Sequence, residues 1–198
     1  MILSASPQTC ASQRPRVDLR AHLRAATRPL HDEVDALYAA FDRRTASGHA
    51  CFLRAQLAAW TALAAPWRGF VSSTLGCSAP DYPGMLRDDL GEIDQAWPAD
   101  PFVVTAPAVI EPAGVIYVLA GSRLGIAAMR KEPGWNDLYG RAGRFMNDQQ
   151  GGKVFKALLR HFDADAGAQL DPGRLCEAAE MAFGLFIETA RLQQEAAR

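Results

Sequence analysis

The sequence predicts an all-helical domain. Alanine, the strongest helix former, is abundant along the 198 residues. Apolar residues recur at steps of three and four, the spacing of one buried helix face, whereas strand-turn-strand units are scarce. A chain of this length can bury one substantial core, and it contains no internal repeat or long polar linker. We therefore expect a loosely ordered tail over 1–17 and a single helical domain over 18–198.

The composition argues against several classes of partner. Hydrophobic residues make up 49% and charged residues 22%, as in ordinary soluble globular proteins. The net charge of −1 provides no field that would attract nucleic acid or an anionic membrane surface. No apolar run approaches the length of a bilayer span, and the four cysteines are too far apart for a zinc motif. We expect a cytoplasmic protein with free thiols and without a nucleic-acid or membrane partner.

The first predicted helix occupies 18–41 and contains both a proline and a histidine. Asp18 can cap its first turn, because its carboxylate accepts hydrogen bonds from unpaired backbone N–H groups. The expected buried positions are Leu23, Ala26, Leu30, Val34, Leu37 and Phe41. Pro29 lacks a backbone donor, so it predicts either a kink or a split into two segments.

The middle of the chain predicts two further helices and two connections. A helix over 48–70 should be bent near its end by Pro66, and a loop rich in Ser, Pro and Gly should cover 72–83. A short helix over 86–93 and an extended, proline-rich connection over 97–112 should follow. The expected buried positions of the longer helix are Phe52, Leu53, Leu57, Trp60, Leu63 and Ala64.

The last third of the chain predicts three long helices. The first covers 113–131 and starts at Pro112, a residue favoured in a first helical turn. After an irregular, glycine-rich stretch with a short helix near 137–145, helices should cover 153–161 and 172–193. The expected buried positions of the final helix are Leu175, Ala178, Ala179, Ala182, Phe183, Phe186 and Ile187.

His31 is the first candidate ligand. At 100° per residue it shares a narrow helix face with Arg24, Thr27 and Asp35, whereas His22 lies on the opposite face. Most all-protein metal sites need three or four ligands, which one histidine cannot supply. A single histidine is sufficient as the proximal ligand of haem iron, because the porphyrin provides the other ligands. The alternative is an ordinary solvated or capping histidine.

Two glycines inside the 113–131 helix are the second candidate feature. Gly121 and Gly125 are four residues apart, hence on one face, and Tyr117 lies one turn before them. Each glycine costs roughly 1 kcal/mol in a helix interior relative to alanine. They indicate either a close helix–helix crossing or a backbone that a ligand must approach closely.

Two cations four residues apart are the third candidate feature. Alone, Lys156 and Arg160 would be a solvated helix face. Cations at the mouth of a site can, however, bind the two propionates of a porphyrin. A porphyrin needs a ligand histidine, a helix that permits close approach and cations at its edge, and the chain supplies all three on separate helices.

At these residues the sequence resembles the haem oxygenase family, and in particular its bacterial, bacteriophytochrome-associated type. The stretch LRAATRPLHDEVD (23–35) is similar to the proximal-helix motif, which makes His31 the iron ligand and Arg24 a propionate-binding cation. YVLAGSRLG (117–125) resembles the distal-helix motif. FKALLR (155–160) resembles a late-helix motif whose cations bind propionates. The likeness extends from about Asp18 to Ala190.

The resemblance implies a single-domain fold with haem sandwiched between a proximal and a distal helix. Haem, both cofactor and substrate, would be opened to biliverdin, carbon monoxide and ferrous iron. O2 and electrons from an external reductant, a ferredoxin or an NADPH-dependent reductase, would drive the reaction, and a bacteriophytochrome could receive the biliverdin. The implied haem-binding residues are Arg24, His31, Tyr117, Gly121, Gly125, Lys156 and Arg160, and the implied catalytic residues are Gly121, Ser122 and Gly125.

The distal motif departs from the family at three positions. Ser122 occupies a position where the better-known branch has an aspartate that organises proton-delivering water, so other groups must deliver protons here. Ala120 replaces a glutamate and Ile126 replaces a glycine of the phytochrome-associated type. The alternative function is therefore a non-catalytic haem-binding carrier or sensor on the same fold. A di-iron or thiaminase-like enzyme is a third reading, but the Glu-x-x-His pairs of a di-iron site are absent from the sequence.

Overall fold

A computed structural model describes residues 17–93, 104–108, 111–131 and 142–197. Over these ranges the protein is all-α and has no strand, as the sequence predicts. The α-helices are α1 (Leu19–Ala39), α2 (Ala46–Ala62), α3 (Ala64–Ser73), α4 (Tyr82–Glu92), α5 (Pro112–Met129), α7 (Arg144–Asn147), α8 (Gln150–Asp163) and α9 (Pro172–Ala196). A 3₁₀ turn, η1 (Gly167–Gln169), connects α8 to α9.

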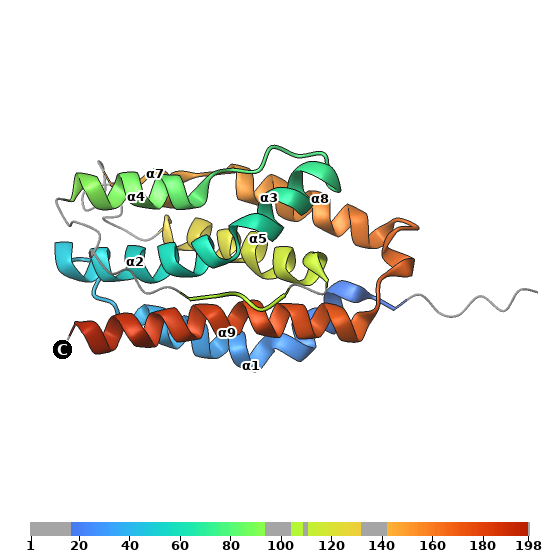
Figure 1. Ribbon diagram of the computed structural model, residues 1–198, viewed down its shortest axis with the longest axis horizontal. Coiled ribbons are helices and arrows are strands. Elements are labelled where there is room, and N and C mark those ends of the chain that lie inside the picture. The colour runs from blue at the N-terminus through green and yellow to red at the C-terminus, as the bar shows by residue number, and fades with distance from the viewer. Residues whose placement is uncertain (1–16, 94–103, 109–110, 132–141, 198) are drawn as a thin grey trace, which may run out of the picture.

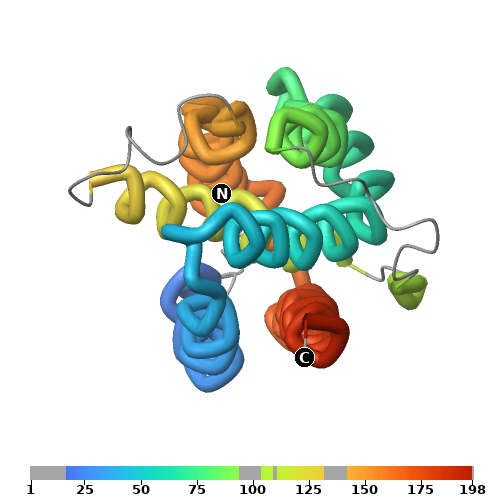
Figure 2. Tube along the Cα trace, turned by 90° about the vertical axis from the view of Figure 1, so that its left-hand side faces the viewer, coloured from blue at the N-terminus to red at the C-terminus, as the bar shows by residue number. Residues whose placement is uncertain are grey.

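The helices are stacked in layers (Figure 1). The long helices α1 and α9 lie side by side in one layer, α2 and α5 form the next, and α4 and α8 lie on the far side. The end-on view in Figure 2 shows the same order, with α2 and α5 between the other two layers. Because α9 packs against α1, α2 and α5, it is the element that holds the two long layers together.

Helix α1 begins as predicted but is not split. The Asp18 carboxylate accepts a 2.9 Å hydrogen bond from the Ala21 N–H, and the helix continues through Pro29 without interruption. The missing Pro29 donor costs one hydrogen bond on an exposed face, which a helix packed against α9 can tolerate. The predicted stripe was wrong at Ala26, which is exposed. Leu23 and Phe41 are buried as predicted, whereas Leu30, Val34 and Leu37 are half-buried against the core; Thr27 and Tyr38 are buried in addition.

The predicted 48–70 helix is two helices. It ends at Ala62, and α3 starts at Ala64 after Leu63 adopts φ −101° and ψ 6°. Pro66 has no N–H to donate to the Ala62 carbonyl, so the break falls one turn before the proline rather than bending the far end. All six predicted buried positions of this segment are buried.

The remaining boundaries follow the predicted order with small shifts. Pro112 starts α5 after the N-cap Glu111, and Asp171 caps α9, whose seven predicted buried positions are all buried. The described end of the short helix predicted at 137–145 contains α7, which starts at Arg144, and 132–141 lie outside the described residues. All but the last residue of the predicted tail over 1–17, and most of the proline-rich connection, also lie outside them.

Helix α5 is the central apolar element. In the described part of the chain it alone is long and apolar enough to cross a membrane, with a mean hydropathy of 1.4. Half of this helix is buried, and it packs against α3, α8 and α9. A core helix of a soluble protein has the same length and composition, so this property does not indicate a membrane span.

Helix α2 carries a histidine that is buried in the core. His49 is 2% exposed, stacks on Phe52 and lies 3.4 Å from the Ala142 carbonyl oxygen. Burial lowers the pKa of His49 from 6.5 to about 4. In the unfolded chain His49 becomes protonated as the pH falls below 6.5, whereas in the folded protein it stays neutral until about pH 4. The free energy of unfolding therefore decreases as the pH falls from 6.5 to about 4.

We expect His49→Gln to flatten the pH dependence of unfolding. The wild type should lose about 3 kcal/mol more than the variant between pH 7 and pH 4, an upper figure from the full shift. Urea unfolding at several pH values measures this difference. His22→Gln, a change at an exposed position of α1, should retain the wild-type slope. Parallel curves for wild type and His49→Gln would contradict the assignment.

Candidate functional site

A cavity of about 350 Å³ opens between α1 and α5. Helix α1 contributes one wall, α5 another, and Phe183 and Phe186 of α9 line it as well. Gln56 of α2 and Phe155 of α8 complete the lining. Both α1 and α5 pack on α9, so this space lies where the two helices diverge from their common support. A volume of this size is within the range of small-molecule and cofactor sites.

His31 lines this cavity and is held by its own helix. Its Nδ1 lies 3.2 Å from an Asp35 carboxylate oxygen, and its ring meets Phe183 edge-on at 6.0 Å between centroids. Asp35 therefore reaches His31 from the next turn of α1. The His31 side chain is 57% exposed. An aspartate at Nδ1 leaves Nε2 as the nitrogen with a lone pair for an external ligand.

Gly114, a third glycine of α5, helps to decide whether Gly121 and Gly125 serve a helix crossing or the approach of a ligand. A Cβ on Gly114 would collide with the Leu175 carbonyl oxygen of α9, so Gly114 lies at a close crossing of α5 and α9. A Cβ on Gly125 would meet no atom within 4 Å, and one on Gly121 would make only an ordinary 3.7 Å contact with Phe155. No described neighbour requires glycine at these two positions, which both line the cavity.

The polar groups on the cavity wall are few. The Ser122 hydroxyl donates a 2.8 Å hydrogen bond to the Leu119 carbonyl, so its lone pairs face outward as acceptors. Gln56 is 7% exposed, and its Oε1 has no hydrogen-bond partner in the described structure. A buried amide oxygen without a partner costs about 1–3 kcal/mol. Gln56 thus offers a hydrogen-bonding group to whatever enters the cavity.

Cations gather at one end of the cavity. Arg20, Arg24 and Tyr117 all line it, and the pKa of Tyr117 is raised by burial but lowered by the two nearby guanidinium groups. The other predicted cations, Lys156 and Arg160, are exposed on α8 and line neither this cavity nor its neighbours. The sequence prediction of a porphyrin site used His31, the glycine pair and the Lys156–Arg160 pair. The structure places His31 and the two glycines in one cavity and leaves Lys156 and Arg160 outside it.

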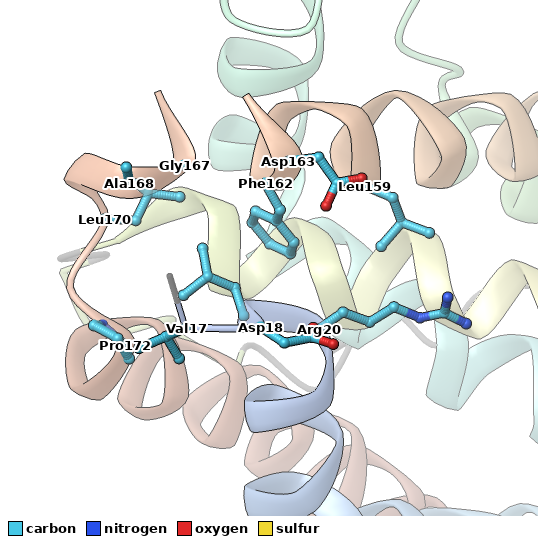
Figure 3. A pocket seen from close by; sticks show the side chains of 11 residues that line it. Val17, Asp18, Arg20, Leu159, Phe162, Asp163, Gly167, Ala168, Leu170 and Pro172 are labelled. Atoms are coloured by element: carbon cyan, nitrogen blue, oxygen red, sulfur yellow. The ribbon is translucent and has the colours of Figure 1, made fainter. Parts of the chain in front are cut away.

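Two further hollows adjoin this cavity. One of about 320 Å³ is also lined by Arg24, His31, Asp35 and Tyr117, so His31 lines both spaces. The face predicted to carry Arg24, Thr27, His31 and Asp35 lines this second hollow in full. A larger one, about 880 Å³ and shown in Figure 3, lies between the start of α1, the end of α8 and η1. Arg20 lines both the large hollow and the cavity.

Several residues of the cavity were not predicted. Arg20, Tyr38, Gln56 and Phe183 line it, and none belongs to a recognisable motif. For Arg20 a signal was present, because it lies one turn before Arg24 on the same helix. Gln56, a polar residue among buried apolar positions of α2, was a second signal.

In the described part of the chain, the site lacks the ligands of an all-protein metal centre. Over 17–93, 104–108, 111–131 and 142–197, no group of three or more His, Cys, Asp or Glu side chains could hold a metal ion. Cys51, Cys77 and Cys176 are free thiols. A metal at His31 would need its remaining ligands from elsewhere, as the iron of a porphyrin has.

Comparison with known proteins adds no family. No family model matches the chain, and no curated protein matches it. The functional argument therefore depends on the residues of the cavity.

Proposed function

We propose that the protein binds haem with His31 as the axial iron ligand and cleaves it oxidatively to biliverdin, carbon monoxide and ferrous iron. One observation carries this proposal: His31 of α1 and the Gly121–Gly125 face of α5 line the same cavity. A flat macrocycle with one vacant axial position needs this combination of a nitrogen ligand on one side and unobstructed backbone on the other. The family resemblance of the two motifs supports the same reading.

The residues of the cavity fit the group. Asp35 accepts the Nδ1 proton of His31, which orients the ring and makes Nε2 a better donor to iron. The open space above Gly125 admits a planar ligand without moving a neighbour. Phe183 and Phe186 supply apolar surface for its faces, and Arg24 offers charge for its acidic arms. When bound, haem supplies the iron that reduces O2 and the porphyrin carbon that is oxidised.

The protein groups near α5 have a supporting role in proton transfer. Ser122 can accept a hydrogen bond from water but already donates to Leu119, so it cannot replace an aspartate as a proton source. The Gln56 amide can hold a water in position from α2. With haem bound, Ser122 and Gln56 would hold a water in the cavity, and that water would supply protons for the reaction.

The remaining components lie outside the chain. We propose a cytoplasmic protein that takes electrons from a ferredoxin or an NADPH-dependent reductase, with a bacteriophytochrome as a possible recipient of the biliverdin. The second candidate function is a non-catalytic haem carrier or sensor. One observation favours it: Ile126 lines the cavity at a position where the phytochrome-associated type has glycine, and α5 contributes no acidic side chain to the cavity.

Haem titration followed by reduction tests the proposal. The protein should give a histidine-ligated Soret band, and ascorbate or a reductase system in air should convert it to biliverdin absorbance within minutes. A Soret band that persists, with no biliverdin formed, would establish the carrier function instead. Failure to bind haem at micromolar concentration would contradict both functions.

A further inference from the structure

Arg20 lies where the cavity and the large hollow meet. It lines both spaces, together with Phe155 on the cavity side and Leu159 on the hollow side, one turn apart on α8. Figure 3 shows the Arg20 side chain extended across α5, with its guanidinium group farthest from Val17 and Leu170. The guanidinium therefore lies at the junction rather than deep in the hollow.

Arg20 forms no ion pair with a described residue. In the described structure no carboxylate forms an ion pair with Arg20 or Arg24, whereas Arg28 is paired with Asp32 at 3.0 Å. Asp18, the acidic residue nearest in sequence, is engaged with the Ala21 N–H. Two adjacent guanidinium groups without a counter-ion repel each other and form a ready site for carboxylates.

Arg20 and Arg24 also converge on one polar group. Burial raises the pKa of Tyr117, and both guanidinium groups are close enough to offset part of this rise. The three side chains thus share the end of the cavity nearest the start of α1. Lys156 and Arg160, the late-helix cations, are exposed and line none of the three spaces.

We propose that Arg20, together with Arg24, clamps the two carboxylates of the ligand at the start of α1 and so selects a dicarboxylate macrocycle. The acidic arms then point to the junction with the large hollow instead of toward the outer face of α8. Arg20 becomes a specificity residue outside every motif of the sequence. This inference rests on the proposed haem function, because it assigns the orientation of that ligand.

The test compares protoporphyrin IX with its dimethyl ester, which lacks both charges. Arg20→Gln should weaken binding of the diacid about ten-fold at low salt, since a charge-assisted hydrogen bond contributes about 1.5–3 kcal/mol. Its affinity for the ester should stay within about two-fold of wild type. High salt should reduce the difference. Arg174→Gln, an equal charge change at an exposed position of α9 that lines none of these spaces, is the matched control.

Two further variants keep the result decisive. Arg20→Lys retains the charge but loses the planar fork, so it should fall between wild type and Arg20→Gln and serves if the glutamine variant does not fold. Equal effects on diacid and diester would overturn the inference, as would a loss found for Arg160→Gln but not for Arg20→Gln. A wild type that binds haem, combined with these results, would leave the proposed function intact. A wild type that binds no porphyrin would overturn both.

Discussion

His31→Ala is expected to abolish the histidine-ligated haem spectrum. The variant loses the one nitrogen ligand that the cavity presents, and no other described histidine lines it. Haem affinity should fall by more than about 100-fold, since loss of a supporting partner of a ligand already costs about 10–100-fold. Titration monitored at the Soret band measures the effect, and external imidazole should restore the spectrum because the vacated space can hold it.

Two variants on α1 separate ligation from general damage. His22→Ala removes an exposed histidine that lines neither the cavity nor the two adjoining hollows, and it should leave haem binding unchanged. Asp35→Asn removes the carboxylate 3.2 Å from Nδ1 and should cause a smaller loss than His31→Ala, with an altered iron–histidine stretching frequency. An unchanged Soret band in His31→Ala would refute the ligand assignment.

Gly125→Leu is expected to prevent haem binding without destabilising the fold. The added side chain would occupy the space in which a Cβ meets no atom within 4 Å. Folding stability should be unchanged or rise by up to about 1 kcal/mol, because leucine is a better helix former than glycine. Haem affinity should fall about 10- to 100-fold, since overpacking a site costs about 1–3 kcal/mol. Thermal unfolding and haem titration measure the two effects separately.

Two glycines provide the contrast. Gly114→Ala should destabilise the protein by about 1–3 kcal/mol, because its Cβ meets the Leu175 carbonyl oxygen across the α5–α9 crossing. Gly69→Leu changes an exposed helix glycine that lines neither the cavity nor the two adjoining hollows, and it should affect neither property strongly. If Gly125→Leu bound haem as tightly as wild type, the close-approach interpretation of α5 would be wrong.

The fold could be predicted from local patterns to within a few residues at most helix ends. Caps at Asp18 and the buried faces of α2 and α9 follow from residue spacing and side-chain chemistry. The errors occurred where a proline is involved. Pro29 proved compatible with a continuous helix, and Pro66 caused a break a turn earlier, because tertiary packing decides whether a missing hydrogen bond is absorbed or ends the helix.

By itself, the sequence determined the all-helical class and those features of the site that lie on one helix. The common face of His31 and Asp35 follows from their spacing of four residues, as does the common face of Gly121 and Gly125, whereas the 3.2 Å contact of His31 with Asp35 is a finding of the structure. Only the tertiary structure decided which helices share a cavity. In the folded protein the cavity lies between α1 and α5, which both pack on α9. Arg20 and Gln56 line this cavity, whereas Lys156 and Arg160 do not. Periodicity specifies a direction around one helix axis, whereas a cavity depends on how several axes pack together.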